Sequence, residues 1–316
     1  MRLGAVALVL VLVAPPLTAE AQPVEKVPRV AYLSVESAED DKSRVAAFRQ
    51  GLRELGYVEG ENIVVEYRAA LPRERMLEVA ADFTRLKVDV LVVRGWHDDL
   101  KKLTIPIVLP VHADPVGVGL VASLARPGGN ITGLSDLHGA TVSKRLELLK
   151  EVRPLASRVA VLWSPLSPIA LPQLKSLQAA APALGMTTLS LEIRRADDID
   201  RAFRVIGNER PGALLVIAEP IVATHRRRIA ELAIKHRLAT IGTTRRFTDA
   251  GFLMAYGANF EDLWRRAATY VDKILKGANP GDLPIEQASK WDLAINLKTA
   301  KAIGVTIPAS LILRAD

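Results

Sequence analysis

The chain has 316 residues, of which 49% are hydrophobic and 24% charged, and its formal net charge is +7. This composition excludes a disordered chain, and the length allows two lobes with hydrophobic cores of their own. Lys and Arg alternate with Asp and Glu along the chain and aromatic residues are only 5%, so no nucleic-acid partner is expected. The lack of cysteine excludes disulfides, thiolate metal sites and a lipoprotein anchor.

Residues 1–21 have the three parts of a secretory signal peptide. A positive start at Met1-Arg2 is followed by an apolar run from Ala5 to Ala14 and by the small-residue cleavage site Ala19-Glu20-Ala21. The apolar run is too short to span a membrane. These features predict a soluble periplasmic protein that is secreted through its signal peptide and is not anchored to lipid.

The first half of the mature chain is predicted to alternate strands and helices in a βαβαβ order, which is typical of a doubly wound parallel sheet. The predicted strands are Arg29–Ser34, Ile63–Tyr67, Val88–Val93, Ile105–Val111 and Ile131–Leu137. The predicted helices are Val45–Leu55, Arg73–Leu86 and a short glycine-rich helix that begins near Val116. Only Trp96–Leu103 separates two of these strands, which is shorter than the usual crossover of about a dozen residues.

The second half repeats this architecture, although not its sequence. Its predicted strands are Arg158–Trp163, Thr187–Ile193, Ala213–Ala218, Ala239–Gly242 and Phe252–Tyr256, and its helices are Lys144–Val152, 170–184, 197–208, 223–237 and Phe260–Leu275. The tail adds strands at Leu283–Gln287 and Trp291–Asn296 and a helix at Leu297–Ile303. The sequence therefore predicts an α/β protein with two doubly wound, Rossmann-like lobes and a cleft between them, where small molecules commonly bind.

Asp114 is the first candidate for a ligand-binding residue. It follows the strand at Ile105–Val111, and ligands of open α/β sheets bind at the carboxyl ends of strands. The alternative is that Asp114 only caps the helix predicted from Val116. The nearby Gly117–Ala122 fits a dinucleotide fingerprint, but it does not directly follow a strand, and Pro127 comes soon after it. No cofactor is therefore expected.

Four stretches of the chain together resemble one protein family. They are Phe48–Asn62, Asp114–Gly133, Lys144–Lys150 and Asn296–Gly304. In this order they resemble the substrate-binding proteins of ABC transporters, of the tryptophan/tyrosine-type family with a type I periplasmic-binding fold. The resemblance covers nearly the whole mature chain.

The resemblance implies a non-enzymatic solute receptor whose two lobes are joined by a hinge and close on a ligand. The lobes are expected at residues 22–138, completed by about 258–285, and at 139–257, completed by about 286–316. The implied partners are a small-molecule solute and an ABC permease with its ATPase at the inner membrane. The positions that match the family's ligand groups are Ser34, Asp114, Arg246-Phe247 and Tyr256-Gly257.

The chain departs from the family pattern at three strand ends. Arg94-Gly95-Trp96 stands where a Thr-Gly-Gly turn is usual, Ser164-Pro165-Leu166 replaces Asn-Pro-Asn, and Glu219-Pro220 replaces Asp-Pro. We therefore expect altered pocket walls, in which Ser164 remains a candidate ligand-binding residue, and the ligand is not inherited from the family.

An amino-acid-like ligand needs donors for its carboxylate and an acid for its ammonium group. Ser34, Thr243 and either Arg246 or Arg94 are candidates for the first role, and Asp114 or Glu219 for the second. Phe247 and Trp96 are candidates for stacking on a flat ligand. Each has a simpler interpretation: the polar groups as helix caps, the arginines in surface ion pairs, and the Trp96 ring as filler in a shortened loop.

No catalytic motif or metal-binding spacing of histidines stands out, so the chain is not predicted to be an enzyme. The run Arg226-Arg227-Arg228 is interpreted as a solvated helix face rather than a docking site. The alternative function is an exported sensory or scaffolding protein whose diverged cleft no longer binds a transported solute.

Overall fold

The computed structural model describes residues 26–316, except for 71–72, 96–97, 137, 168 and 218–219. The predicted signal peptide lies outside the described residues. Within them, no helix combines the length and the apolar character that crossing a membrane requires.

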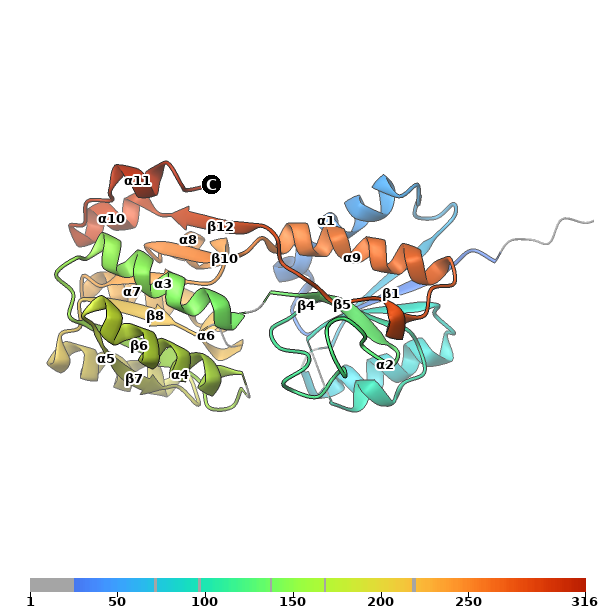
Figure 1. The fold of residues 1–316 in the computed structure, drawn as a ribbon, viewed down its shortest axis with the longest axis horizontal. Helices are drawn as coiled ribbons and strands as arrows, with labels where there is room; N and C mark the ends of the chain where they lie inside the picture. Colours follow the sequence, from blue (N-terminus) through green and yellow to red (C-terminus); the bar gives the residue numbers. More distant parts are fainter. Residues whose placement is uncertain (1–25, 71–72, 96–97, 137, 168, 218–219) are drawn as a thin grey trace, which may run out of the picture.

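Each of the two lobes in Figure 1 is built around a six-stranded sheet. In the first lobe the strand order is β11-β5-β4-β3-β1-β2, and every pair is parallel. Its strands are β1 (Arg29–Ser34), β2 (Val64–Ala69), β3 (Val90–Arg94), β4 (Ile107–His112), β5 (Ile131–Ser135) and β11 (Glu286–Gln287). Its helices are α1 (Ala38–Glu54), α2 (Met76–Arg85) and α9 (Phe260–Leu275), with short 3-10 helices η1 (Arg73–Arg75), η2 (Asp98–Lys102) and η4 (Pro280–Asp282).

The second sheet has the order β12-β10-β9-β8-β6-β7, in which only β12 is antiparallel to its neighbour. Its strands are β6 (Arg158–Trp163), β7 (Thr187–Glu192), β8 (Ala213–Val216), β9 (Ala239–Gly242), β10 (Met254–Ala258) and β12 (Trp291–Ile295). Its helices are α3 (His138–Val152), α4 (Ala170–Ala180), η3 (Ala181–Leu184), α5 (Asp197–Glu209), α6 (Pro220–Thr224), α7 (Arg226–Lys235), α8 (Arg245–Asp249), α10 (Leu297–Ile303) and α11 (Ala309–Ile312). The two α/β lobes predicted from the sequence are confirmed.

The central strands bury both faces because helices cover each sheet on both sides, whereas the edge strands β2, β7 and β11 are partly exposed. In β1, Tyr32 packs in one hydrophobic core with Phe48 of α1, whereas Leu33 packs in another with Phe83 of α2. Successive side chains of a strand point to opposite faces, so one apolar run supplies two cores. This explains why the strands read as continuous apolar segments.

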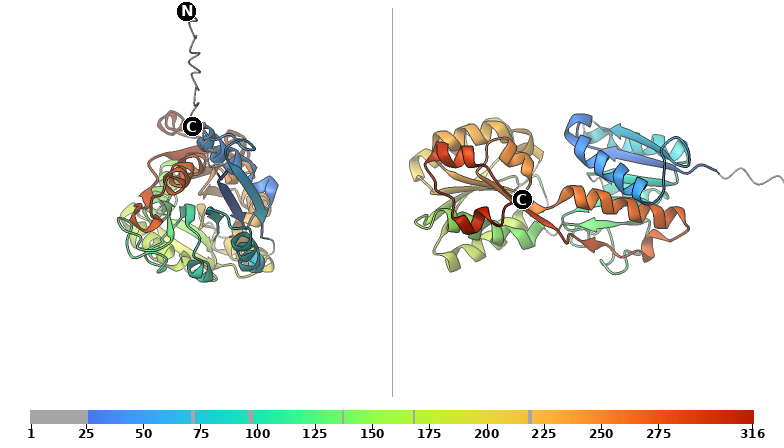
Figure 2. Two further views of the ribbon diagram at one scale, coloured as in Figure 1. Left: turned by 90° about the vertical axis from the view of Figure 1, so that its right-hand side faces the viewer. Right: turned by 90° about the horizontal axis from the view of Figure 1, so that it is seen from above.

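The chain passes between the lobes three times: from β5 to α3, from β10 to α9, and from β11 to β12. Helix α9 therefore follows a strand of the second sheet but packs beside α1 in the first lobe (Figure 2). At Gly51 the two helices are so close that a Cβ atom would lie 2.2 Å from the carbonyl oxygen of Arg265. Since β11 pairs with β5, the last passage comes after Gln287.

The short glycine-rich helix predicted from Val116 does not form. This segment folds as consecutive turns, in which the Gly117 N–H donates to Asp114 Oδ1 at 2.7 Å. A Cβ atom at Gly117 would lie 2.0 Å from the Asp114 carboxylate, and Gly119 has a left-handed φ of +70°. The glycines that suggested a helix thus serve the turns instead.

Candidate functional site

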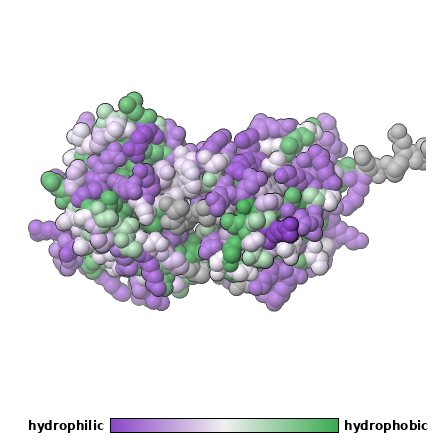
Figure 3. All heavy atoms as spheres, in the orientation of Figure 1, coloured by the Kyte–Doolittle hydropathy of each residue, from purple (hydrophilic) through white to green (hydrophobic). Residues whose placement is uncertain are grey.

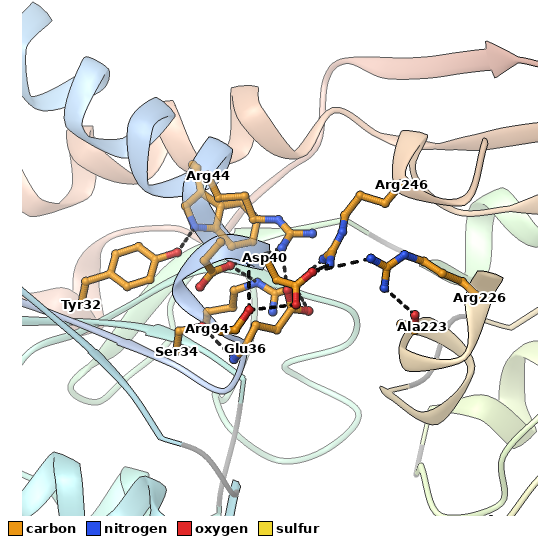
Figure 4. A network of polar contacts seen from close by, with 12 residues as sticks. Tyr32, Ser34, Glu36, Asp40, Arg44, Arg94, Ala223, Arg226 and Arg246 are labelled. Atoms are coloured by element: carbon orange, nitrogen blue, oxygen red, sulfur yellow. Dashed lines mark hydrogen bonds and ion pairs between the residues drawn. The ribbon is translucent and has the colours of Figure 1, made fainter. Parts of the chain in front are cut away.

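A group of charged side chains fills the space between the lobes, where β1 and β3 of the first sheet end (Figure 4). We call it the interlobe charge cluster. Its members are Glu36, Asp40, Asp41, Arg44 and Arg94 of the first lobe and Arg226 and Arg246 of the second. Figure 3 shows that the molecule narrows between the two lobes.

Glu36 lies at the centre of the cluster, on the loop between β1 and α1. Its carboxylate accepts hydrogen bonds from Arg44 at 3.0 Å and from Arg246 at 2.9 Å, and it pairs with Arg94 at 2.6 Å. Two of these guanidinium groups come from its own lobe and the third comes from α8 across the cleft. One carboxylate therefore bonds to both lobes.

Asp40 makes the other contacts across the cleft. Arg246 donates to its carboxylate, and Arg226 at the start of α7 lies 3.6 Å from it. The Ser37 hydroxyl caps α1 by accepting from the Asp40 N–H at 3.1 Å, and it also donates to the Asp40 carboxylate at 2.9 Å. The helix cap thus fixes the residue that reaches toward the second lobe.

Asp41 and two aromatic rings position the two arginines of the first lobe, Arg44 and Arg94. Asp41 is fully buried and lies 3.3 Å from Arg44 and 3.1 Å from Arg94. Arg44 lies over the rings of Phe260 and Trp264, and Arg94 lies over Trp264. Both guanidinium groups are consequently positioned by charge and by cation–π contact.

Burial of Glu36 tends to raise its pKa, but Arg94, Arg44 and Arg246 together outweigh burial and lower the pKa below its usual 4.5. A carboxyl whose folded pKa is depressed contributes stability above its unfolded pKa and loses it as the pH falls through the folded pKa. We therefore expect acidification from about pH 5 to about pH 3 to destabilise the wild-type chain more than Glu36→Gln. Urea unfolding followed by tryptophan fluorescence at both pH values measures this difference.

Glu39→Gln provides the matched control, because Glu39 is exposed on the first turn of α1 beside the cluster. This variant should keep the acid sensitivity of the wild type. Equal acid sensitivity of wild type and Glu36→Gln would contradict the role given to the Glu36 carboxylate.

A second buried polar group lies next to the passage from β5 to α3. Asp136 and Thr141 line a cavity of about 10 Å³ together with Thr243, Gly257, Phe260 and Trp291. Arg145 is fully buried nearby, donates to the Val216 carbonyl at 3.3 Å, and feels the charge of Asp136. Burial lowers the pKa of Arg145 to about 10, while Asp136 opposes this shift.

The model of the family described as ABC transporter substrate binding protein matches residues 30–316. The chain belongs to this family. It is 25% identical to the tyrosine-binding protein of Clostridioides difficile (strain R20291) over 278 residues, which cover 85% of this chain and 78% of the relative. Substrate-binding proteins of ABC importers are solute-binding proteins that act outside the cytoplasm.

Solved structures agree with the type I periplasmic-binding fold. A conserved domain protein from Vibrio cholerae has a TM-score of 0.81 at 27% identity, with 92% of this chain and 99% of the other covered. The L-Trp complex from Streptococcus pneumonia has a TM-score of 0.79 at 21% identity, covering 91% and 98%. The ligand-free, open structure of a substrate binding protein from Clostridium difficile has a TM-score of 0.69 at 23% identity. The match covers 90% of this chain and 97% of the other.

Two residues expected to bind ligand in this substrate-binding protein lie in the interlobe charge cluster, namely Arg94 and Arg246. Both do pair with acids, as the simpler interpretation expected, but these acids lie between the lobes. Ser34 is fully buried beside the cluster, where its hydroxyl accepts from the Glu36 N–H at 3.0 Å. Arg226, interpreted as part of a solvated helix face, instead turns toward Asp40.

Other expected residues lie elsewhere. Asp114 is exposed and holds the turn at Gly117, in line with a capping role although the helix itself is missing. Phe247 is 3% exposed and packs edge-on against Phe252, so it belongs to the core of the second lobe and not to a stacking surface. Ser164 is buried and accepts from the Leu166 N–H at 3.4 Å.

Two expected residues adjoin the passages between the lobes. Thr243 is 4% exposed and lines the 10 Å³ cavity, and Tyr256 stacks on Trp291 with ring centroids 6.3 Å apart. Glu219 and Trp96 lie outside the described residues.

Sequence reasoning missed four acidic residues and one arginine between the lobes. They are Glu36, Asp40, Asp41 and Arg44 of the cluster, and Asp136 of the small cavity. The helix was predicted to begin only at Val45, and acids at a helix N-terminus are common for local reasons. One signal was present, because Asp41 and Arg44 occur at a spacing of three on a helix whose other face is apolar. Among the described residues no group of His, Asp and Glu is arranged to hold a metal ion.

Proposed function

We propose that this protein is the extracytoplasmic solute-binding component of an ABC importer. It binds a small molecule between its lobes and delivers it to a membrane permease and the associated ATPase. The observation that supports this best is the meeting of polar side chains from both lobes at the cleft, where Arg246 bonds to Glu36. We further propose that residues 1–21 direct export to the periplasm.

The proposed ligand is an amino acid or an aromatic or carboxylate compound, since the related proteins are a tyrosine-binding protein and a complex with L-Trp. The cleft side chains are mainly donors, as a ligand carboxylate requires. The contacts that we propose come from Ser34, Arg94, Ser164, Thr243, Arg246 and Tyr256.

Binding requires the lobes to move apart, because the cavity lined by Thr243 holds only about 10 Å³, close to the space of one water molecule. The three passages of the chain between the lobes allow rotation of one lobe against the other. A ligand that contacts both lobes then favours closure by its differential affinity for the closed state.

A thermal-shift screen of the chain against amino acids, aromatic acids and small carboxylates tests the proposal. A ligand at about 100 times its dissociation constant adds roughly 2.7 kcal/mol to the stability of the folded state, which raises the melting temperature by several degrees. Thr243→Val should weaken the affinity for the ligand about tenfold, because a hydrogen bond to a charged group is worth roughly 1.5 kcal/mol or more.

Asp114→Ala is the control, since Asp114 lies in an exposed turn, and this variant should bind the ligand like the wild type. If no compound of a broad library shifts the melting temperature, the transport function fails. The sensory or scaffolding role then becomes the better account.

A further inference from the structure

The side chain of Glu36 occupies the interlobe charge cluster in the way that a bound carboxylate would. Its two oxygens meet three guanidinium groups, with Arg94 at 2.6 Å, Arg246 at 2.9 Å and Arg44 at 3.0 Å (Figure 4). Arginine forks are the usual protein ligands for carboxylates. A free carboxylate at this position would contact both lobes at once.

The first-lobe arginines do not depend on Glu36 for their positions. Arg94 and Arg44 both pair with the buried Asp41, and both lie over Trp264, at 5.8 Å and 5.4 Å from guanidinium carbon to ring centroid. Their side chains are only 14% and 6% exposed. If the Glu36 side chain moves away, Arg44 and Arg94 therefore keep their positions around the site that its carboxylate occupied.

Glu36 itself is held less firmly than these arginines. It lies on the loop between β1 and α1, and a quarter of its side chain is exposed. The loop carries Ser34 and Ser37 on either side, whose hydroxyls accept from the N–H groups of Glu36 and Asp40. The side chain thus borders solvent and can be exchanged for another carboxylate.

The charges of the cluster favour an incoming anion. Four arginines oppose Glu36, Asp40 and Asp41, which gives 4 − 3 = +1. With the Glu36 side chain displaced, the same groups carry 4 − 2 = +2. A dianion balances this charge, whereas a zwitterionic amino acid leaves it unbalanced, and unbalanced charge away from water is costly.

We propose that the cleft takes a dicarboxylate solute, one carboxylate of which displaces Glu36 from Arg44, Arg94 and Arg246. This inference rests on the proposed function and names the class of its ligand. Glu36 then acts as a tethered competitor that fills the site until the solute arrives. It also keeps the lobes together by its bond to Arg246.

Isothermal titration calorimetry of the full chain with succinate, L-glutamate, L-tyrosine, L-tryptophan and putrescine tests this proposal. We expect a dicarboxylate to bind, and Glu36→Gln to strengthen its binding about tenfold or more, because a competitor that reduces the competent population reduces apparent affinity in proportion. Arg94→Gln should weaken it about tenfold or more, since it removes a charge-assisted bond.

Glu39→Gln is the matched control. It removes the same charge beside the cluster, but Glu39 is exposed on the first turn of α1 and is not a member of the cluster, so binding should change less than about threefold. Glu36→Ala serves as a second variant should Glu36→Gln fold poorly, and it should strengthen dicarboxylate binding in the same way.

Three results would overturn the inference. If tyrosine, tryptophan or putrescine binds and the dicarboxylates do not, the ligand class is wrong while solute binding stands. If the dicarboxylates bind but the Glu36 variants leave their binding unchanged or weaker, the displacement of Glu36 is wrong. If no compound of this set or of the broad library binds either wild type or Glu36→Gln, both the ligand class and the proposed function fail.

Discussion

Replacing Trp264 with alanine is expected to lower the free energy of unfolding by about 4 kcal/mol, within the range for a large buried aromatic side chain. Trp264 is fully buried on α9, and its indole N–H donates to the hydroxyl of Tyr32. It also supports the guanidinium groups of Arg44 and Arg94. Its loss leaves a cavity at the point where the core of the first lobe meets the site.

Chemical denaturation in urea measures the effect. Trp264→Phe keeps much of the ring volume but cannot donate to Tyr32, so about half of the loss is expected. Leu155→Ala, at a side chain that is 98% exposed, should stay within about 0.5 kcal/mol of the wild type. A loss of less than about 1 kcal/mol in Trp264→Ala would contradict the central place of α9 in the first lobe.

Arg145→Met is expected to lower the free energy of unfolding by about 3 kcal/mol. Arg145 is fully buried and Asp136 is 3% exposed, so the substitution takes an opposite charge away from a carboxylate that is shielded from water. A buried charge that loses a nearby opposite charge is costly, because little solvent is present to compensate the loss. Thermal and urea unfolding of the purified variant measure the loss.

The double variant Arg145→Met with Asp136→Asn separates this charge effect from packing. Because it removes both charges, it should recover at least about half of the stability lost in Arg145→Met. Additive losses from the two substitutions would show that the charges of Arg145 and Asp136 are not coupled.

The fold was predictable because its strands are apolar on both faces and alternate with amphipathic segments. Residues 29–34 and 158–163 read as buried parallel strands, and they are the strands β1 and β6 of the two sheets. The segment after Asp114 was mistaken for a helix, because glycine spacing fits a helix start and a chain of turns equally well. The left-handed φ of Gly119, which a right-handed helix does not contain, distinguishes the two.

The site was predictable at strand ends but not at the helix beside them. Arg94 and Arg246 follow buried strands, and the topology of parallel sheets places such residues in the cleft. Glu36 and Asp40 precede or begin a helix, where acids are common for local reasons. Their bonds to Arg246 join residues more than 200 positions apart, and no local pattern reports such a pairing.

The placement of α9 and β11 in the first lobe sets the order in which a newly made chain completes its lobes. The first sheet has five of its strands by Ser135, yet its core needs Trp264 of α9, and its edge needs Glu286–Gln287. Because a chain is synthesised from its N-terminus, the first lobe cannot be completed until most of the second lobe has been synthesised. Such distant pairings slow folding. The N-terminal half consequently stays unfinished for nearly the whole of synthesis.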